Sequence, residues 1–162
     1  MWDEPVELQL NWGYVADTVM GGVSQGGGSR EMYHGRDAVV LRGDVSLDNN
    51  GGFVQIAANL RDGGQAVDAN HWHGIALDVR GNNEVYDFRL RTDQLTRPWQ
   101  SFRAEFTATD TWQTIRFSFG DFESNNTTAT FDPAQLRRVG VLGVGRAFTA
   151  EVAVSGIRFY HD

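Results

Sequence analysis

Short runs in which apolar and polar residues alternate recur along most of the chain, and this pattern constrains the fold more than any other feature. In residues 85–92, for example, Tyr86, Phe88 and Leu90 are separated by single charged residues. Successive side chains of a β-strand point to opposite faces of its sheet, so each such run predicts a strand with one face in a core. The repetition predicts an all-β sandwich or barrel.

We expect strands to occupy most of the chain, at residues 6–10, 31–33, 38–44, 53–59, 74–80, 85–92, 100–107, 113–118, 139–143 and 151–159. The apolar residues expected between two sheets are Phe88, Leu90, Phe102, Phe106, Ile115, Phe117 and Ile157. Asp132 and Pro133 predict a single helical turn as far as Arg138, because Asp is a favoured N-cap and Pro a favoured first helical residue. Residues 25–29 and 124–130 are predicted to be loops.

Length and composition narrow the possible functions. The 162 residues fit one domain, residues 1–162. The chain has no cysteine, which excludes disulfide frameworks, thiolate metal sites and cysteine nucleophiles. Its basic residues are all arginine, which excludes Schiff-base and P-loop lysine mechanisms. The formal net charge of -7 argues against nucleic acid as a partner.

The sequence also bears on location. No apolar run approaches the roughly 20 residues of a membrane span, and the chain does not open with a secretory signal pattern. We therefore expect no integral membrane segment and a cytoplasmic location. The absence of lysine is typical of a GC-rich genome, which indicates a bacterial source.

Two loops with paired glycines, at residues 17–24 and 48–53, are the most unusual segments. A doubled glycine lets a second backbone approach closely, so the two loops are candidates for one polar rim that binds a ligand or partner. The candidate residues in these loops are Asp17, Met20, Gly21, Gly22, Ser24, Asn50, Gly51 and Gly52. The alternative is that both loops are structural turns.

Arg80 and Trp99 complete the candidate binding residues. Arg80 ends an expected strand, where it could bind a carboxylate, lie over an aromatic ring or form a surface salt bridge with Glu84 or Asp78. Trp99 follows an Arg-Pro pair at a loop end and is the tryptophan most expected to be exposed. Exposed indoles stack on sugars, but most tryptophans anchor a core or an edge.

His71 and His73 lie on the same side of an extended segment, a spacing that can begin a zinc or copper site. No third histidine is near them in the sequence, so we expect no transition metal and no other cofactor. A calcium ion held by loop oxygens stays open, because such sites leave little trace in a sequence. None of the common catalytic motifs is present, and the chain is not expected to be an enzyme.

One set of motifs resembles a known family. The string at residues 17–24, followed by Asn-Gly-Gly-Phe at 50–53, is similar to the complex I intermediate-associated protein family. Further matching residues are Asn11, Trp12, Gly74, Ile75, Val79, Arg80, Gly81, Tyr86, Trp112, Phe117, Phe119 and Phe122. The resemblance covers roughly residues 10–160 and implies a jelly-roll β-sandwich of the galactose-binding-domain-like class. It also implies an assembly role, since mitochondrial members are chaperones of respiratory complex I without catalytic activity.

Two functional hypotheses follow. The first is a non-enzymatic binding module with a protein partner, in a chaperone-like or assembly role; the resemblance implies respiratory complex I subunits or intermediates as that partner. The second is a carbohydrate-binding module. An exposed Trp99 or Trp72 beside a groove would favour a sugar, and a contiguous apolar patch of several hundred Å² would favour a protein.

Overall fold

The computed structural model describes residues 6–8, 10–16, 22, 24–48, 52–97 and 99–161. The strands in these ranges are β1 (Val6–Glu7), β2 (Gly13–Ala16), β3 (Gln25–Tyr33), β4 (Arg36–Val45), β5 (Phe53–Asn59), β6 (Gly74–Gly81), β7 (Glu84–Thr92), β8 (Ser101–Ala108), β9 (Gln113–Ser118), β10 (Glu123–Asn125), β11 (Leu136–Val144) and β12 (Phe148–Tyr160). Single 3-10 turns are η3 (Asp62–Gly64), η4 (Phe119–Asp121) and η5 (Pro133–Gln135). The described ranges contain no α-helix, as the alternation predicted.

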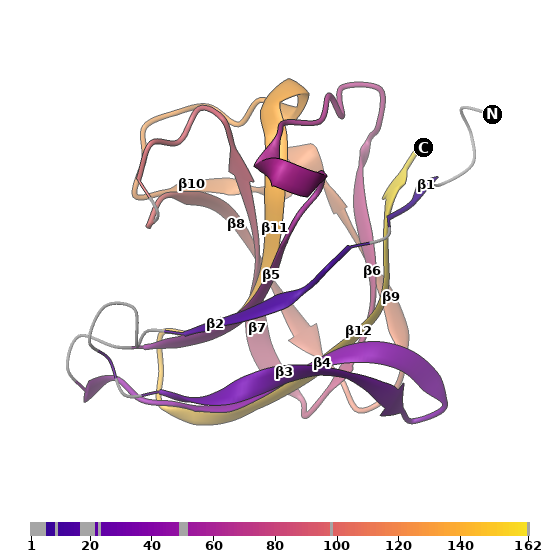
Figure 1. Cartoon of the computed structure of the whole chain (residues 1–162), viewed down its shortest axis with the longest axis vertical. Coiled ribbons are helices and arrows are strands. Elements are labelled where there is room, and N and C mark those ends of the chain that lie inside the picture. Colours follow the sequence, from indigo (N-terminus) through magenta and orange to yellow (C-terminus); the bar gives the residue numbers. More distant parts are fainter. Residues whose placement is uncertain are drawn as a thin grey trace.

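The strands form two antiparallel sheets that pack against each other (Figure 1). The first sheet has the order β3-β4-β12-β6-β9, and β1 also pairs with β12. The second sheet has the order β10-β8-β7-β11-β5-β2. In Figure 1, β5, β7, β8 and β11 lie in one layer and β6, β9 and β12 in the other. The predicted all-β jelly-roll sandwich is therefore confirmed.

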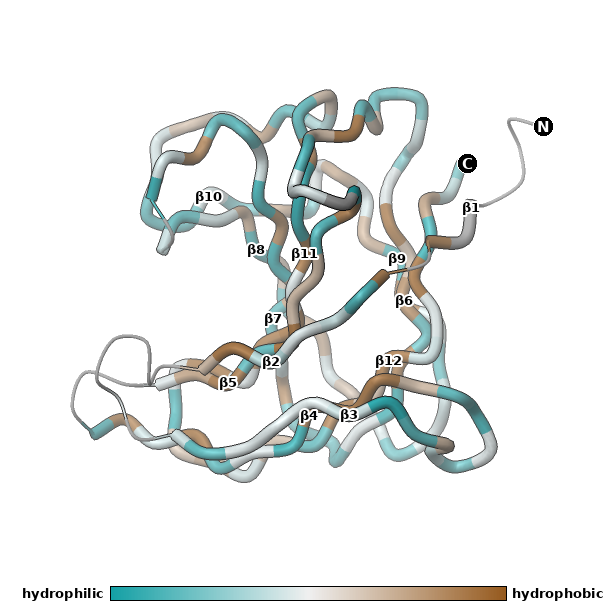
Figure 2. The backbone as a smooth tube through the Cα atoms, viewed as in Figure 1, coloured by the Kyte–Doolittle hydropathy of each residue, from teal (hydrophilic) through white to brown (hydrophobic). Residues whose placement is uncertain are grey.

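Apolar side chains from both sheets fill the space between them. The ring of Phe88 on β7 is fully buried, and its centroid lies 5.0 Å from that of Phe117 on β9. Burying a side chain of this size stabilises a fold by roughly 1.5–3 kcal/mol. Figure 2 shows hydrophobic and hydrophilic residues interleaved along the strands, as expected when each strand has one buried face.

Most of the predicted core residues are buried, namely Phe88, Leu90, Phe102, Phe106, Phe117 and Ile157. The prediction was wrong for Ile115, which is only partly buried. Ile115 lies on β9, the edge strand of the first sheet, and lines a hollow between β9 and β8. An edge strand has a neighbour on one side only, so less protein covers its inward-facing side chains.

The largest error in the predicted strands concerns β3. We expected a strand only at residues 31–33 and a flexible loop at 25–29, but β3 begins at Gln25 and pairs with β4 along its whole length. A Cβ on Gly26 would lie 2.6 Å from the Cα of Gly43, so the glycine lets the two backbones meet. The glycines in this segment therefore allow close strand packing and do not mark a loop.

The remaining differences are smaller. The short strands β2 and β10 were not predicted, and β10 occupies residues placed partly in a loop. The expected helical turn is confirmed only as η5, where the Asp132 carboxylate accepts a hydrogen bond from the Ala134 N–H at 3.0 Å. β11 begins at Leu136, so the turn ends before Arg138, because residues from 136 onward pair with β7 and β5.

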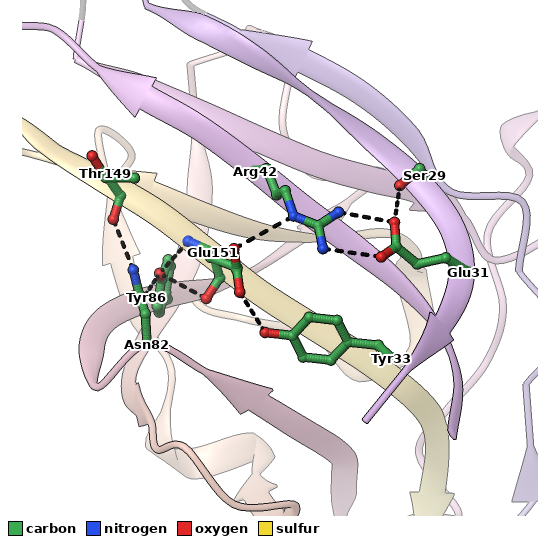
Figure 3. A network of polar contacts seen from close by, with 8 residues as sticks. All are labelled: Ser29, Glu31, Tyr33, Arg42, Asn82, Tyr86, Thr149 and Glu151. Carbon is green, nitrogen blue, oxygen red and sulfur yellow. Dashed lines mark hydrogen bonds and ion pairs between the residues drawn. The ribbon is translucent and has the colours of Figure 1, made fainter. Parts of the chain in front are cut away.

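A buried tyrosine connects the two sheets (Figure 3). Tyr86 on β7 donates its hydroxyl proton to Asn82 Oδ1 at 2.6 Å and accepts a hydrogen bond from the Glu151 N–H at 2.9 Å. Asn82 in turn donates to the Thr149 carbonyl at 2.9 Å. Glu151 and Thr149 lie on β12, so this hydroxyl fixes the second sheet against a central strand of the first.

Candidate functional site

The structure brings together the described residues that flank the two glycine loops. The Ser46 N–H donates to Ser24 Oγ at 2.8 Å, and that hydroxyl donates to the Ser46 carbonyl at 3.2 Å. On the other side, the Gly145 N–H donates to the Gly52 carbonyl at 3.1 Å. Leu47 links these two contacts, since it follows Ser46 in the chain and a Cβ on Gly52 would be 3.2 Å from Leu47 Cδ2. We call Ser24, Ser46, Leu47, Gly52 and Gly145 the loop end.

The loop end has a buried base and one exposed apolar side chain. Ser24 is 1% exposed, and Gly22 and Gly52 are buried. Gly52 has a φ of 140°, which disfavours any other residue, and its Cα also faces Leu47. The Leu47 side chain is 52% exposed. The expected candidates Asp17, Met20, Gly21, Asn50 and Gly51 lie outside the described residues.

Arg80 does not lie at the loop end. It is half-buried on β6, where it pairs with Ala153 of β12, and Ala153 pairs with Val40 of β4. Val40 is well inside β4, which reaches the loop end only after Val45. Arg80 is therefore at mid-sheet.

The salt bridge considered for Arg80 is not found among the described residues. Asp78 pairs with Arg158 at 2.7 Å and Glu84 pairs with Arg146 at 2.7 Å. Both carboxylates thus have another arginine as their partner.

Trp99 is exposed, as predicted, but it lies at the other end of the second sheet. Its side chain is 57% exposed, and the guanidinium of Arg97 lies 6.0 Å from its ring. It belongs to the connection that follows Thr92, which pairs with Leu136 at the start of β11. Gly145 follows the end of β11, so Trp99 and the loop end are separated by the length of the sheet.

Each of three aromatic rings on the outer face of the first sheet has the guanidinium group of an arginine over it. The distances to the ring centroids are 4.9 Å for Arg36 over Trp112, 5.8 Å for Arg42 over Tyr33 and 5.1 Å for Arg116 over Tyr160. In a cation–π contact of this kind the guanidinium lies over a face of the ring. In these three rings an arginine therefore occupies a face on which a sugar could otherwise stack.

A charged network surrounds one of these rings (Figure 3). Glu31 accepts two hydrogen bonds from Arg42, at 2.8 and 2.9 Å, and one from Ser29 at 2.6 Å. The bonds from Arg42, and then that from Ser29, lower the pKa of Glu31 to about 2. Tyr33 donates to Glu151 at 2.6 Å; burial, together with this bond, raises the pKa of Tyr33 to about 12. The network joins β3, β4 and β12, and in it the Arg42 guanidinium pairs with two carboxylates, those of Glu31 and Glu151.

Hollows at the open sides of the sandwich contain none of the expected site residues. One hollow of about 180 Å³ lies beside β2 and β3 and is lined by Leu10, Asn11, Trp12, Gly28, Ser29, Arg30, Val39 and Ile56. Another, of about 330 Å³, is lined by charged and apolar residues of β8, β9 and their neighbours. Trp72 is half-buried, with its ring stacked 6.2 Å from that of Phe159. Neither Trp99 nor Trp72 lines these hollows.

No group of three or more histidine, aspartate or glutamate side chains is placed to hold a metal ion within the described ranges. His73 donates its N–H to the Tyr160 carbonyl at 2.9 Å, and its ring lies 5.7 Å from that of Tyr160. The expected absence of a transition metal stays a prediction. Among the described residues, no helix is long and apolar enough to cross a membrane.

A comparison with protein-family models decides the family. The model for complex I intermediate-associated protein 30 matches residues 3–150. The chain belongs to this family. The resemblance inferred from the glycine-loop motifs is thereby confirmed. No curated protein sequence gives a significant match to the chain.

Carbohydrate-binding modules are among the solved structures similar to this family member. The family 11 module of a cellulosomal cellulase from Clostridium thermocellum has a TM-score of 0.79 and 15% identity, over 98% of this chain and 95% of that one. The same family's module in complex with a β-1,3-1,4-mixed-linked tetrasaccharide has a TM-score of 0.77 and 15% identity, over 97% and 95%. A family 30 module from C. thermocellum has a TM-score of 0.63 and 17% identity, over 99% and 94%. At this identity the likeness establishes the sandwich fold.

Sequence reasoning missed one buried charge in this family member. Asp87 was placed on the solvent side of β7, and it does point outward, yet it is only 2% exposed. Two arginines cover it, Arg89 at 2.9 Å and Arg103 at 2.7 Å. An outward-facing aspartate between arginines on adjacent strands could have signalled this, but only once the pairing of β7 with β8 was known.

Proposed function

We propose that this family member is a non-enzymatic binding module whose partner is a protein, and that it acts in an assembly or chaperone-like role. The observation that carries the proposal is Leu47, an apolar side chain 52% exposed at the point where the flanks of both glycine loops meet. The family description, complex I intermediate-associated protein 30, supports an assembly context. It makes intermediates of respiratory complex I the first partner to test.

The base of the loop end suits it to recognition. Ser24 and Gly52 are buried and hydrogen-bonded to the backbone of Ser46 and Gly145, so the described base of this surface is preformed. Covering a leucine side chain is worth roughly 1.5–3 kcal/mol, and a preformed surface loses less entropy on binding. The proposed contact surface is the loop end together with Asp17, Met20, Gly21, Gly22, Asn50 and Gly51.

The proposal is tested with Leu47→Asp and a matched control, Met32→Asp. Met32 is also an exposed apolar residue, 71% exposed, but it pairs with Asp37 near the start of β4, whereas the loop end lies beyond Val45 at the other end of that strand. The tagged full chain is used to capture proteins from the organism of origin, and subunits of complex I are sought by mass spectrometry. We expect wild type and Met32→Asp to retain the same protein and Leu47→Asp to lose it, with equal melting temperatures. Equal capture by all three would refute a contact at the loop end.

Asp17→Ala provides a second test of the same surface. If Asp17 contacts the partner, capture is lost and the melting temperature is unchanged. If Asp17 only satisfies amides of its own loop, the protein loses about 1–3 kcal/mol of stability and keeps its partner. The second result would remove Asp17 from the proposed surface.

A carbohydrate is the second candidate ligand. The similarity to carbohydrate-binding modules over nearly the whole of both chains, and the exposed Trp99, favour it. The guanidinium-covered rings of the first sheet disfavour it. Titration with soluble β-1,3-1,4-mixed-linked glucan tests this candidate: saturable binding that Trp99→Ala abolishes would support a sugar ligand, and no binding would exclude this glucan.

A further inference from the structure

The outer face of the second sheet contains a carboxylate that bridges two arginines on neighbouring strands. Arg89 of β7 and Arg103 of β8 lie directly opposite each other. Asp87 accepts hydrogen bonds from both, from Arg89 Nε at 2.9 Å and from Arg103 Nη2 at 2.7 Å. Two like charges directly opposite each other destabilise a sheet, and the carboxylate between them reverses this effect.

The same face contains a second pair of opposed arginines, one strand over and two residues further along β7. Arg91 of β7 lies directly opposite Arg138 of β11. Arg91 donates to the Arg97 carbonyl at 2.9 Å, and Arg138 donates to Asn59 Oδ1 at 2.9 Å. Both acceptors are neutral. Within the described part of the chain, no carboxylate pairs with either arginine.

A third arginine adds to this positive cluster. Arg137 precedes Arg138, and its Nη1 lies 3.6 Å from Asp93, the one carboxylate among the described residues that pairs with the cluster. The Nε atoms of Arg91 and Arg137 are buried without an acceptor in the described structure. Burial, and then the charges of Arg137 and Arg138, lower the pKa of Arg91. The three guanidinium groups thus have fewer carboxylate partners among the described residues than they could bind.

We propose that side-chain carboxylates of an acidic segment in a partner protein bridge Arg91 and Arg138, as Asp87 bridges Arg89 and Arg103. Guanidinium groups match the geometry of carboxylates, and the adjacent strands that carry Arg91 and Arg138 lie roughly 4.8 Å apart. In an extended acidic segment, alternate side chains lie roughly 7 Å apart on one side, so one segment can bring more than one carboxylate to this cluster.

This inference rests on the proposed function in one respect, namely that the partner is a protein. The surface that it concerns is a different one. Arg91 and Arg138 lie at the end of β11 near Leu136, whereas the loop end lies beyond Val144. The net charge of the chain is -7, so the molecule as a whole repels an acidic peptide. Binding of such a peptide therefore reports on this cluster and weakens as salt is added.

The test uses an end-blocked hexaglutamate peptide, titrated into the full chain by calorimetry at low salt. Hexaglutamine and inorganic phosphate are titrated in parallel. The variants are Arg91→Gln and Arg138→Gln, and the control is Arg116→Gln, an exposed arginine on β9 of the other sheet. We expect hexaglutamate to bind wild type and Arg116→Gln equally and each cluster variant about tenfold or more weakly. Hexaglutamine should not bind, and phosphate should bind more weakly than the peptide.

The melting temperature separates a binding role from a structural one. Removing one of two opposed like charges should leave the free protein as stable as before or more stable, so Arg138→Gln should not lower the melting temperature. Unchanged peptide affinity in Arg138→Gln, or phosphate binding as tight as the peptide, would overturn the inference. Failure of hexaglutamate to bind, with partner capture still lost in Leu47→Asp, would overturn this inference and leave the proposed function standing.

Discussion

At the scale of single residues, polar groups in and beside the core do more to position the two sheets than their number suggests. Tyr86 is 1% exposed, and its hydroxyl contacts Asn82 and the Glu151 backbone. The alternation of residues 85–92 was enough to place this ring in the core. The bond to the Glu151 N–H could not be predicted, because Glu151 lies on β12, more than sixty residues further along the chain.

Tyr86→Phe should therefore destabilise the protein although the ring stays in place. The change leaves the Glu151 N–H and Asn82 without their partner inside the protein, which costs about 1–3 kcal/mol. The check is the free energy of unfolding in urea. Tyr33→Phe is the control and should cost less, since Glu151 keeps its contact with Arg42 at 3.4 Å. A Tyr86→Phe protein as stable as wild type would show that the hydroxyl is not needed.

The same tyrosines predict a loss of stability at alkaline pH. Burial raises the pKa of Tyr86 from 10.0 to about 12, and burial with the bond to Glu151 raises that of Tyr33 to about 12. The folded state thus favours the protonated phenols more than the unfolded state does. This stabilisation is fully present below pH 10 and is lost as the pH rises toward 12. Melting temperatures measured from pH 8 to 12 should fall over this interval, and less steeply in Tyr86→Phe.

At the scale of elements, alternation placed most of the strands well and three of the edge strands, β2, β3 and β10, poorly. β5 and β9 have the bounds predicted from sequence, 53–59 and 113–118. β3 was cut short because glycine lowers strand propensity, and the close approach of Gly26 to β4 cannot be read from a sequence. β10 was missed because three residues are too few to show a period.

The two adjacent glycines of β3 should respond oppositely to substitution. A Cβ on Gly26 would meet the backbone of Gly43 at 2.6 Å, whereas one on Gly27 would meet nothing within 4 Å. Gly26→Ala should push β3 away from β4 and lower the melting temperature. Gly27→Ala should be neutral or stabilise the fold by about 0.4–1 kcal/mol, since alanine restricts the unfolded chain. If the two variants melt together, β3 does not depend on this contact.

At the scale of the whole molecule, function depends on what the strand order brings together. The sequence pointed to two glycine loops, and the structure places their described flanks, Ser24 and Gly52, on either side of Ser46 and Leu47. The sequence could not show that Leu47 is the exposed residue there, since a single leucine in a loop forms no pattern. The sequence also could not show that Arg91 lies opposite Arg138, because that pairing follows from the register of β7 and β11.

The chain's lack of lysine leaves few amines for common cross-linkers, so a photoreactive side chain is the direct way to locate a partner. A benzophenone-bearing amino acid would be placed at Leu47 in one protein and at Met32, at the other end of β3 and β4, in another, and both would be irradiated in the cells of origin. We predict a discrete adduct with another protein from position 47 and none from position 32. An adduct from position 32 alone, or none from either position, would contradict the claim that the loop end binds a protein.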